Sequence, residues 1–190
     1  MRGSDSLSIK ELNALTEACG GNLGIRDKTL IELFAATGLR VSEIATLKVP
    51  QVVVASKALD FLHLEAEHTK RKRGGKLPLN ERVKAMLEIY VVWLRTWYQG
   101  EWLFPGYDDK HITSRAIQKI IKRLKRDAGL TKKVTPHSLR KHFINRLLDD
   151  KTDIRVVRSL SRHANLESLH AYVEENEGEA VAAVERLGKR

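Results

Sequence analysis

The spacing of apolar residues changes once along this chain, in residues 49–79, and that change constrains the fold most. From Leu62 to Ala66, apolar and polar residues alternate, as in a strand with one face in water. Residues 76–79 read as the return strand, and residues 52–54 as an earlier strand of the same sheet. Elsewhere the apolar residues follow the helical period. The sequence therefore predicts a mainly α fold with a small antiparallel β-sheet, an α+β domain.

Capping residues mark where the helices begin. Ser8 with Glu11 forms a capping box, and Thr135 followed by Pro136 is a strong helix start. Gly38 ends the second helix. The expected helices run from Ile9 to the stop at Gly20, from Ile25 to Thr37, from Glu43 to Leu47 after a cap at Ser42, from Asn80 to about Tyr98, from Thr113 or Ser114 onward, from Thr135 to about Asp149, and from Asp153 to about Leu160.

The composition favours a negatively charged partner. The 190 residues suffice for one domain with a real core, and 34 Lys and Arg against 24 Asp and Glu give a net charge of +10. Nucleic acid is the first candidate, an anionic membrane surface the second, and a merely solvated basic surface the third. The single cysteine, Cys19, excludes an internal disulfide. We expect no membrane span and, without a signal peptide, a cytoplasmic protein, nucleoid-associated if prokaryotic.

Basic residues gather in two places. A hairpin turned at Gly74 and Gly75 joins the two strands, and one face of the helix after Thr113 is cationic. Either cluster can simply be hydrated, but six cations and one acid on the helix face favour DNA contact. The expected DNA-binding residues are Arg71, Lys72, Arg73, Arg115, Lys119, Lys122 and Arg123.

Two further spacings point to chemistry. His137 and Arg140 lie three apart on one capped helix, so both point the same way. Tyr172 follows His163 by nine residues. Taken singly, each of these residues more often has a structural role than a catalytic one. Cations gathered around one tyrosine hydroxyl suggest chemistry on a phosphodiester.

With these residues, the chain from about Ser6 to Tyr172 resembles the catalytic domain of the tyrosine recombinase/integrase family. The segment Thr-Gly-Leu-Arg-Val-Ser-Glu resembles the first-arginine box, which implies that Arg40 is catalytic and Glu43 supports it. The resemblance likewise implies catalytic roles for the residues that match the family's other motifs. These are Lys70, His137, Arg140, His163 and Tyr172.

Two positions depart from the family pattern. Lys70 stands eight residues before Pro78, as the family's lysine does, but lacks the flanking glycines, so Lys72 or Lys76 remains an alternative. The residue before the later histidine is usually glycine and here is Arg162, which either contacts a phosphate or is exposed.

Phosphodiester cleavage gives each matched residue a role. Arg40 and Arg140 can hold the two non-bridging oxygens through forked, charge-assisted bonds. Tyr172 would attack, with His137 as base, and Lys70 would protonate the leaving 5′-oxygen, while His163 would bind a phosphate oxygen. The sequence contains no carboxylate cluster or Cys/His ligand set, so we expect no metal and no cofactor.

The resemblance implies site-specific cleavage and rejoining of double-stranded DNA through a 3′-phosphotyrosyl intermediate, in a homo-tetramer on DNA. We expect a leader in residues 1–5, a catalytic domain in 6–175, and a C-terminal helix in 176–190 that docks on a neighbour or on its own domain. No N-terminal core-binding domain precedes Ser6, so the chain is expected to be a catalytic fragment or a minimal member. Alternatives are a type IB topoisomerase, a telomere resolvase or a catalytically silent DNA-binding protein.

Overall fold

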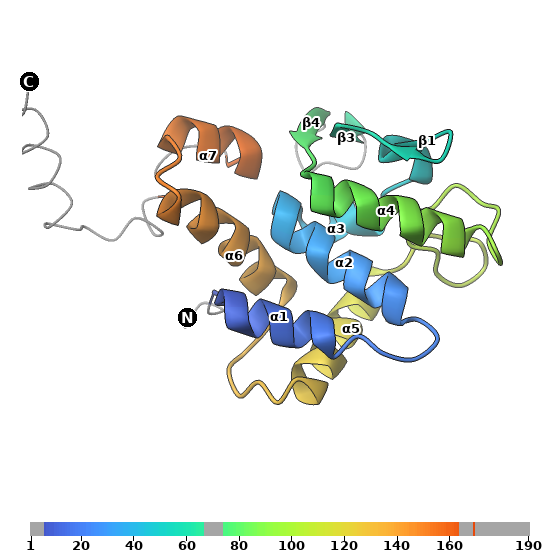
Figure 1. The fold of residues 1–190 in the computed structure, drawn as a ribbon, viewed down its shortest axis with the longest axis horizontal. Coiled ribbons are helices and arrows are strands. Elements are labelled where there is room, and N and C mark those ends of the chain that lie inside the picture. Colours follow the sequence, from blue (N-terminus) through green and yellow to red (C-terminus); the bar gives the residue numbers. More distant parts are fainter. Residues whose placement is uncertain (1–5, 67–73, 164–168, 170–190) are drawn as a thin grey trace, which may run out of the picture.

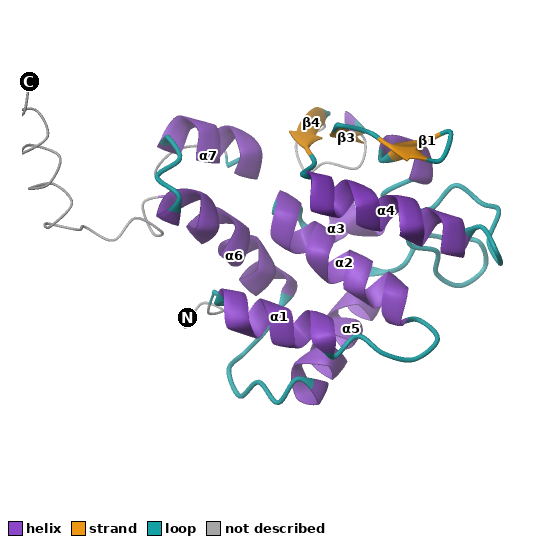
Figure 2. Cartoon of the chain, viewed as in Figure 1, coloured by secondary structure: helices purple, strands orange, loops and turns teal. Residues whose placement is uncertain are grey.

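The structure of the protein, a computed structural model, describes residues 6–66, 74–163 and 169 (Figure 1). Helices dominate this part of the chain, and short strands lie along one side (Figure 2). The elements in order are α1 (Ile9–Glu17), α2 (Gly24–Thr37), α3 (Val41–Ala45), the 3-10 helix η1 (Val49–Gln51), β1 (Val53–Val54), β2 (Lys57–Ala58), β3 (Phe61–Leu64), β4 (Gly75–Pro78), α4 (Glu81–Leu94), α5 (Ser114–Asp127), α6 (Pro136–Asp149) and α7 (Ile154–Ser161).

The strands form two separate antiparallel pairs rather than one sheet. β3 pairs with β4, as predicted, with the buried Leu62 opposite the buried Leu77. β1 pairs with β2 instead of joining them, so the expectation of one sheet that includes residues 52–54 is wrong. Ala55 and Ser56 both have positive φ and turn the chain back directly after β1, which gives that strand a local partner. Ala66 is exposed and lies beyond β3.

Helix α2 lies at the centre of the fold. It packs against α1, α4 and α6, and its apolar residues Leu30, Ile31, Leu33 and Phe34 are fully buried. A smaller apolar cluster joins α6 and α7 and includes Leu169. Helix α6 therefore packs against α2 and also against α7, and these contacts hold the three helices together (Figure 1).

Local capping signals located most helix starts correctly. The side chains of Ser8, Asn80, Thr113, Thr135 and Asp153 each accept a hydrogen bond from a backbone N–H in the first turn of their helix. Each of these bonds satisfies a donor that the helix itself leaves unpaired. Such signals are local in sequence, which is why they could be read without tertiary information.

Two local expectations were wrong. Helix α3 begins at Val41 with Arg40 as its N-cap, not after Ser42, because the Glu43 carboxylate reaches back to the Arg40 backbone N–H. Helix α4 ends at Leu94, not near Tyr98, since the following residues form a turn.

Gly38 is expected to be the most sensitive glycine of the site region. Its φ is +58°, and a Cβ added there would lie 2.3 Å from Cδ1 of the Phe143 ring. Gly38→Ala should therefore lower the free energy of unfolding by about 2–4 kcal/mol, from left-handed strain plus overpacking. Gly21→Ala is the matched control: its φ is +72°, but nothing lies within 4 Å. Urea unfolding should show a loss of only about 1 kcal/mol for the control; equal losses would mean that the Phe143 contact costs nothing.

Candidate active site

The corner between α2 and α3 presents Arg40 and buries its acidic partner. Gly38 ends α2 in the left-handed conformation, so the chain turns sharply into α3. Glu43, whose side chain is 1% exposed, accepts hydrogen bonds from the backbone N–H of Arg40 at 2.7 Å and from its Nη1 at 3.0 Å. The carboxylate thus fixes both the backbone and the guanidinium of Arg40, whose side chain is about one third exposed.

Arg140 reaches the same corner from α6. Its side chain is buried, and its guanidinium donates from Nη1 to the Gly38 carbonyl and from Nη2 to the Ser161 carbonyl. One planar group therefore bridges the end of α2 and the end of α7. Such forked donation suits arginine and not lysine, whose charge sits at a single point.

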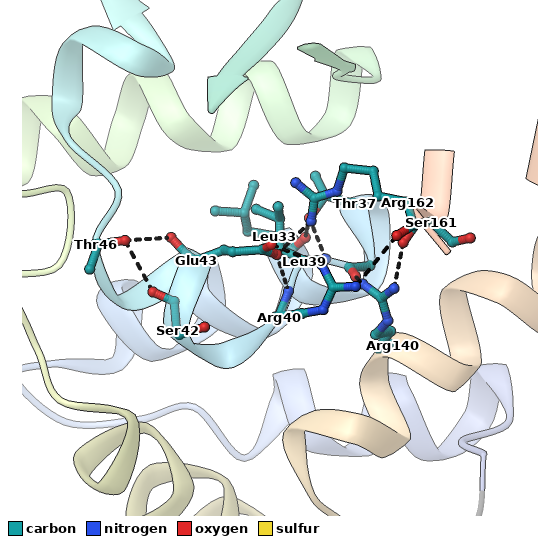
Figure 3. A network of polar contacts seen from close by, with 11 residues as sticks. Leu33, Thr37, Leu39, Arg40, Ser42, Glu43, Thr46, Arg140, Ser161 and Arg162 are labelled. Carbon is teal, nitrogen blue, oxygen red and sulfur yellow. Dashed lines mark hydrogen bonds and ion pairs between the residues drawn. The ribbon is translucent and has the colours of Figure 1, made fainter. Parts of the chain in front are cut away.

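Arg140 and Arg40 both donate hydrogen bonds to backbone carbonyls at the end of α7 (Figure 3). Arg140 donates to the Ser161 carbonyl, and Arg40 donates from Nη2 to the Arg162 carbonyl at 3.4 Å. The last carbonyls of a helix have no partner within the helix and carry partial negative charge, so they favour nearby cations. Two guanidiniums from segments a hundred residues apart therefore converge next to His163.

The surroundings lower the pKa of both predicted histidines. Burial, with the positive charges of Arg140 and Arg40 and the nearby His137, lowers the pKa of His163 to about 4. The Ser161 hydroxyl lies 2.7 Å from Nδ1 of His163. Partial loss of hydration, followed by the charges of Lys141 and Arg140, also lowers the pKa of His137. The Ser161 hydroxyl also lies 3.5 Å from the Arg158 carbonyl, to which it can donate. A neutral His163 keeps one N–H, on the ring nitrogen that carries the proton, and the other ring nitrogen accepts.

The low pKa of His163 makes the stability pH-dependent. In the unfolded chain His163 has a pKa of about 6.5, so it binds a proton below that pH, whereas in the folded chain it does so only below about pH 4. The free energy of unfolding therefore decreases as the pH falls from about 6.5 to about 4. We expect the free energy of unfolding to drop by about 1–2 kcal/mol from pH 7 to pH 5 through this group. Urea titrations of the wild type and of His163→Gln should show a smaller drop in the variant; parallel curves would contradict the assignment.

Several predicted site residues lie outside the described part of the chain. These are Lys70, Arg71, Lys72, Arg73 and Tyr172. Lys76, the alternative to Lys70, is described: it is exposed in β4, opposite His63 of β3. Leu169 is the described residue that lies nearest to Tyr172 in sequence, and it is buried against α6 and α7.

The cationic side chains of α5 differ in their surroundings: some are exposed, and one forms ion pairs within the protein. The apolar residues of α5, Ile117, Ile120, Ile121 and Leu124, are buried. The opposite face leaves Arg115, Lys119 and Lys122 exposed. Arg123 instead pairs with the buried carboxylate of Asp27 and lies 3.7 Å from Asp127. It therefore has a structural partner, whereas the three exposed cations remain available to a ligand.

Sequence reasoning missed the backbone acceptors that orient the arginines. The carbonyls of Gly38, Ser161 and Arg162 hold Arg140 and Arg40, and a carbonyl leaves no trace in residue identity. It also missed Ser161 as a partner of His163, although a serine two residues before a histidine was visible. Arg162 proved neither simply exposed nor isolated, because it binds Glu43.

This arrangement is suited to an anion with several oxygens. Two arginines and a neutral histidine that can donate supply hydrogen bonds and positive charge from three directions, as needed where negative charge builds up during phosphoryl transfer. In the part of the chain that the structure describes, no three His, Cys, Asp or Glu side chains gather as metal ligands. No helix in the same part is long and apolar enough to cross a membrane.

The chain matches the model of the phage integrase family over residues 5–179. Among curated relatives, it is 31% identical over 159 residues to the tyrosine recombinase XerD of Listeria innocua, which covers 79% of this chain and 50% of the relative. It is 32% identical over 176 residues to XerD of Staphylococcus epidermidis, covering 88% and 57%. The chain thus spans about half the length of the curated relatives it matches.

Solved structures share the fold. The crystal structure of XerA recombinase superposes with a TM-score of 0.78 at 24% identity, over 100% of this chain and 67% of the other. XerH site-specific recombinase, in its pre-cleavage complex with difH substrate, gives 0.77 at 20% identity over 94% and 53%. The Tn1549 transposon integrase in complex with a circular intermediate DNA gives 0.78 at 19% identity over 98% and 67%. The predicted catalytic-domain fold is confirmed.

Proposed function

The chain belongs to the phage integrase family, and from this premise we propose that it is the catalytic part of a site-specific DNA recombinase or integrase. It cleaves and rejoins strands of double-stranded DNA through a 3′-phosphotyrosyl intermediate, without a metal. The names of the XerD relatives and the DNA complexes of the XerH and Tn1549 neighbours support this proposal. Such an enzyme works where the DNA is, in the cytoplasm.

The observation that carries the proposal is the convergence of Arg40 and Arg140. Burying a guanidinium is costly unless it is paired, and the carbonyls of Gly38 and Ser161 hold the guanidinium of Arg140 in place. Arg40 and Arg162 share the single carboxylate of Glu43. Those three side chains therefore keep a net positive charge beside His163, which suits a phosphodiester.

Residues of this chain can supply the nucleophile, the base and the acid that strand cleavage requires. The Tyr172 hydroxyl attacks phosphorus, its proton passing to neutral His137, and a bond forms between phosphorus and the phenolic oxygen. The bond to the 5′-oxygen breaks, and Lys70 gives that oxygen a proton. Arg40, Arg140 and His163 hold the non-bridging oxygens as their charge grows. Rejoining is the reverse, so the energy of the ester bond is retained.

Other parts of the chain would bind the DNA backbone and mediate contacts between subunits. The exposed Arg115, Lys119 and Lys122 of α5, together with residues 71–73 of the hairpin, would contact phosphates. We place the catalytic domain at 6–175. Residues 176–190, outside the described residues, would dock on a neighbouring subunit in a tetramer that forms on DNA. Unchanged assembly on DNA after deletion of 176–190 would count against that docking.

The proposal is tested by covalent capture. The protein is incubated with a library of duplexes of random sequence, each nicked so that the short product beyond the cleaved bond is lost and rejoining is blocked. EDTA is present throughout. We expect a protein–DNA adduct that survives detergent and heat but not protease, and the recovered DNA then identifies the target site.

The outcomes separate the alternatives. Strand cleavage that depends on added Mg²⁺ and leaves no adduct would contradict the phosphotyrosyl mechanism. DNA binding without any adduct would favour a catalytically silent protein. With the target site in hand, plasmid relaxation without exchange between two sites would favour a topoisomerase.

A further inference from the structure

Arg162 occupies a backbone position that suits glycine. It follows the last residue of α7 with φ 53° and ψ 41°, the left-handed conformation that ends many helices. Any side chain is less favourable there than glycine, because its Cβ crowds the backbone. The residue therefore carries local strain directly beside His163.

The side chain does not extend into solvent. It folds back to α3, where Nη2 donates to Oε2 of Glu43 at 2.5 Å, and it is only 19% exposed (Figure 3). In return, Arg40 donates to the Arg162 carbonyl. Arg40, Glu43 and Arg162 thus form a closed set of contacts between the α2–α3 corner and the end of α7.

The charges of these three side chains do not cancel. Glu43 carries one negative charge and binds two guanidiniums, those of Arg40 and Arg162. Without Arg162, the carboxylate would neutralise Arg40 alone. With it, the three groups together keep a charge of +1, in a half-buried place where screening by water is weak. Arg162 thereby offsets the carboxylate that orients Arg40.

Two other nitrogens of Arg162 are buried without a hydrogen bond to the described residues. Nε and Nη1 find no partner within residues 6–66, 74–163 and 169, and a buried donor without a partner is destabilising. Together with the backbone strain, this makes Arg162 locally unfavourable. Strain of this kind concentrates at functional sites, where surrounding structure holds it in place.

We propose that Arg162 is a positioning residue of the active site, which takes up part of the charge of Glu43 so that Arg40 faces the scissile phosphate with its own charge largely intact. The inference rests on the proposed function, because it assigns Arg162 to that reaction. Arg162 acts through Glu43 and does not itself contact the DNA.

Three variants test the role of charge. Arg162→Gln keeps the length but removes the charge, and Arg162→Lys keeps the charge. Because Arg162 uses only Nη2 on Glu43, a single ammonium can replace it. Arg158→Gln is the matched control, since Arg158 is exposed one turn earlier on α7. In single-turnover capture on the nicked target site, we expect about a 10-fold slower rate for Gln, within about 3-fold of wild type for Lys, and no change for the control.

DNA binding distinguishes positioning from direct contact. The slope of log affinity against log salt should be the same for Arg162→Gln and wild type, because a lost phosphate contact would lower it by about 1. A lowered slope overturns the proposal, and so does a wild-type rate in Arg162→Gln or an equal loss in Gln and Lys. Absence of the adduct in the wild type defeats the proposed function itself, whereas a reactive wild type with an equally reactive Gln variant defeats only this inference.

Discussion

Tyr172→Phe is expected to abolish the covalent protein–DNA complex while leaving DNA affinity within about twofold of wild type. The substitution removes one hydroxyl, the only atom of that side chain that can form a phosphoester, and keeps the ring. The arginines and His163 still bind the phosphate, but no nucleophile is left to attack it. Single-turnover capture on the nicked target site measures the adduct, and filter binding measures the affinity.

A matched tyrosine serves as the control. Tyr107 is 86% exposed in the loop before α5, so Tyr107→Phe should leave both the adduct and the affinity unchanged. An adduct that persists in Tyr172→Phe at more than about a hundredth of the wild-type rate would place the nucleophile elsewhere. A loss of adduct in both variants would point to a general effect on folding.

Arg140→Ala is expected to slow adduct formation about 10²–10³-fold and to lower the free energy of unfolding by about 3 kcal/mol. The first effect follows from the loss of one of two guanidiniums on the non-bridging oxygens. The second arises because the carbonyls of Gly38 and Ser161 lose a charged donor inside the protein. Single-turnover rates and urea unfolding measure the two effects separately. Arg140→Lys should recover only part of each, because one ammonium cannot bridge both carbonyls.

Arg146 supplies the control on the same helix. It is 42% exposed and pairs with Asp149 and Asp150 at the surface, at 4.0 and 3.5 Å. Arg146→Ala should change stability by less than about 1 kcal/mol and leave the rate unchanged. If Arg140→Ala lost stability but reacted at the wild-type rate, Arg140 would be structural and the site would have to be centred on other cations.

Much of the fold could be read from local signals. The helix starts at Ser8, Asn80 and Thr135 each depend on contacts within one helix, so the sequence alone located them. The pairing of β1 was predicted wrongly because three successive valines favour a strand but do not show which strand it joins. The cap of α3 was misassigned because Glu43, not Ser42, reaches the free backbone donor.

The candidate site was predictable as a set of residues but not as an arrangement. The spacing of His137 from Arg140 indicated a shared helix face. It did not show that Arg140 would be buried between two carbonyls while His137 stays the more accessible of the pair. Arg123 looked like its neighbours on α5 and instead pairs with Asp27, a residue on another helix. Such partnerships are tertiary, so no pattern within one element reveals them.

The most direct test of the central claim is to identify the atom that carries the DNA. The captured adduct is digested with protease and nuclease, and the peptide with its residual nucleotide is sequenced by mass spectrometry. We predict a nucleotide joined through its 3′-phosphate to Tyr172, and a released strand that ends in a free 5′-hydroxyl. Linkage through a 5′-phosphate, or through any residue other than Tyr172, would contradict the account.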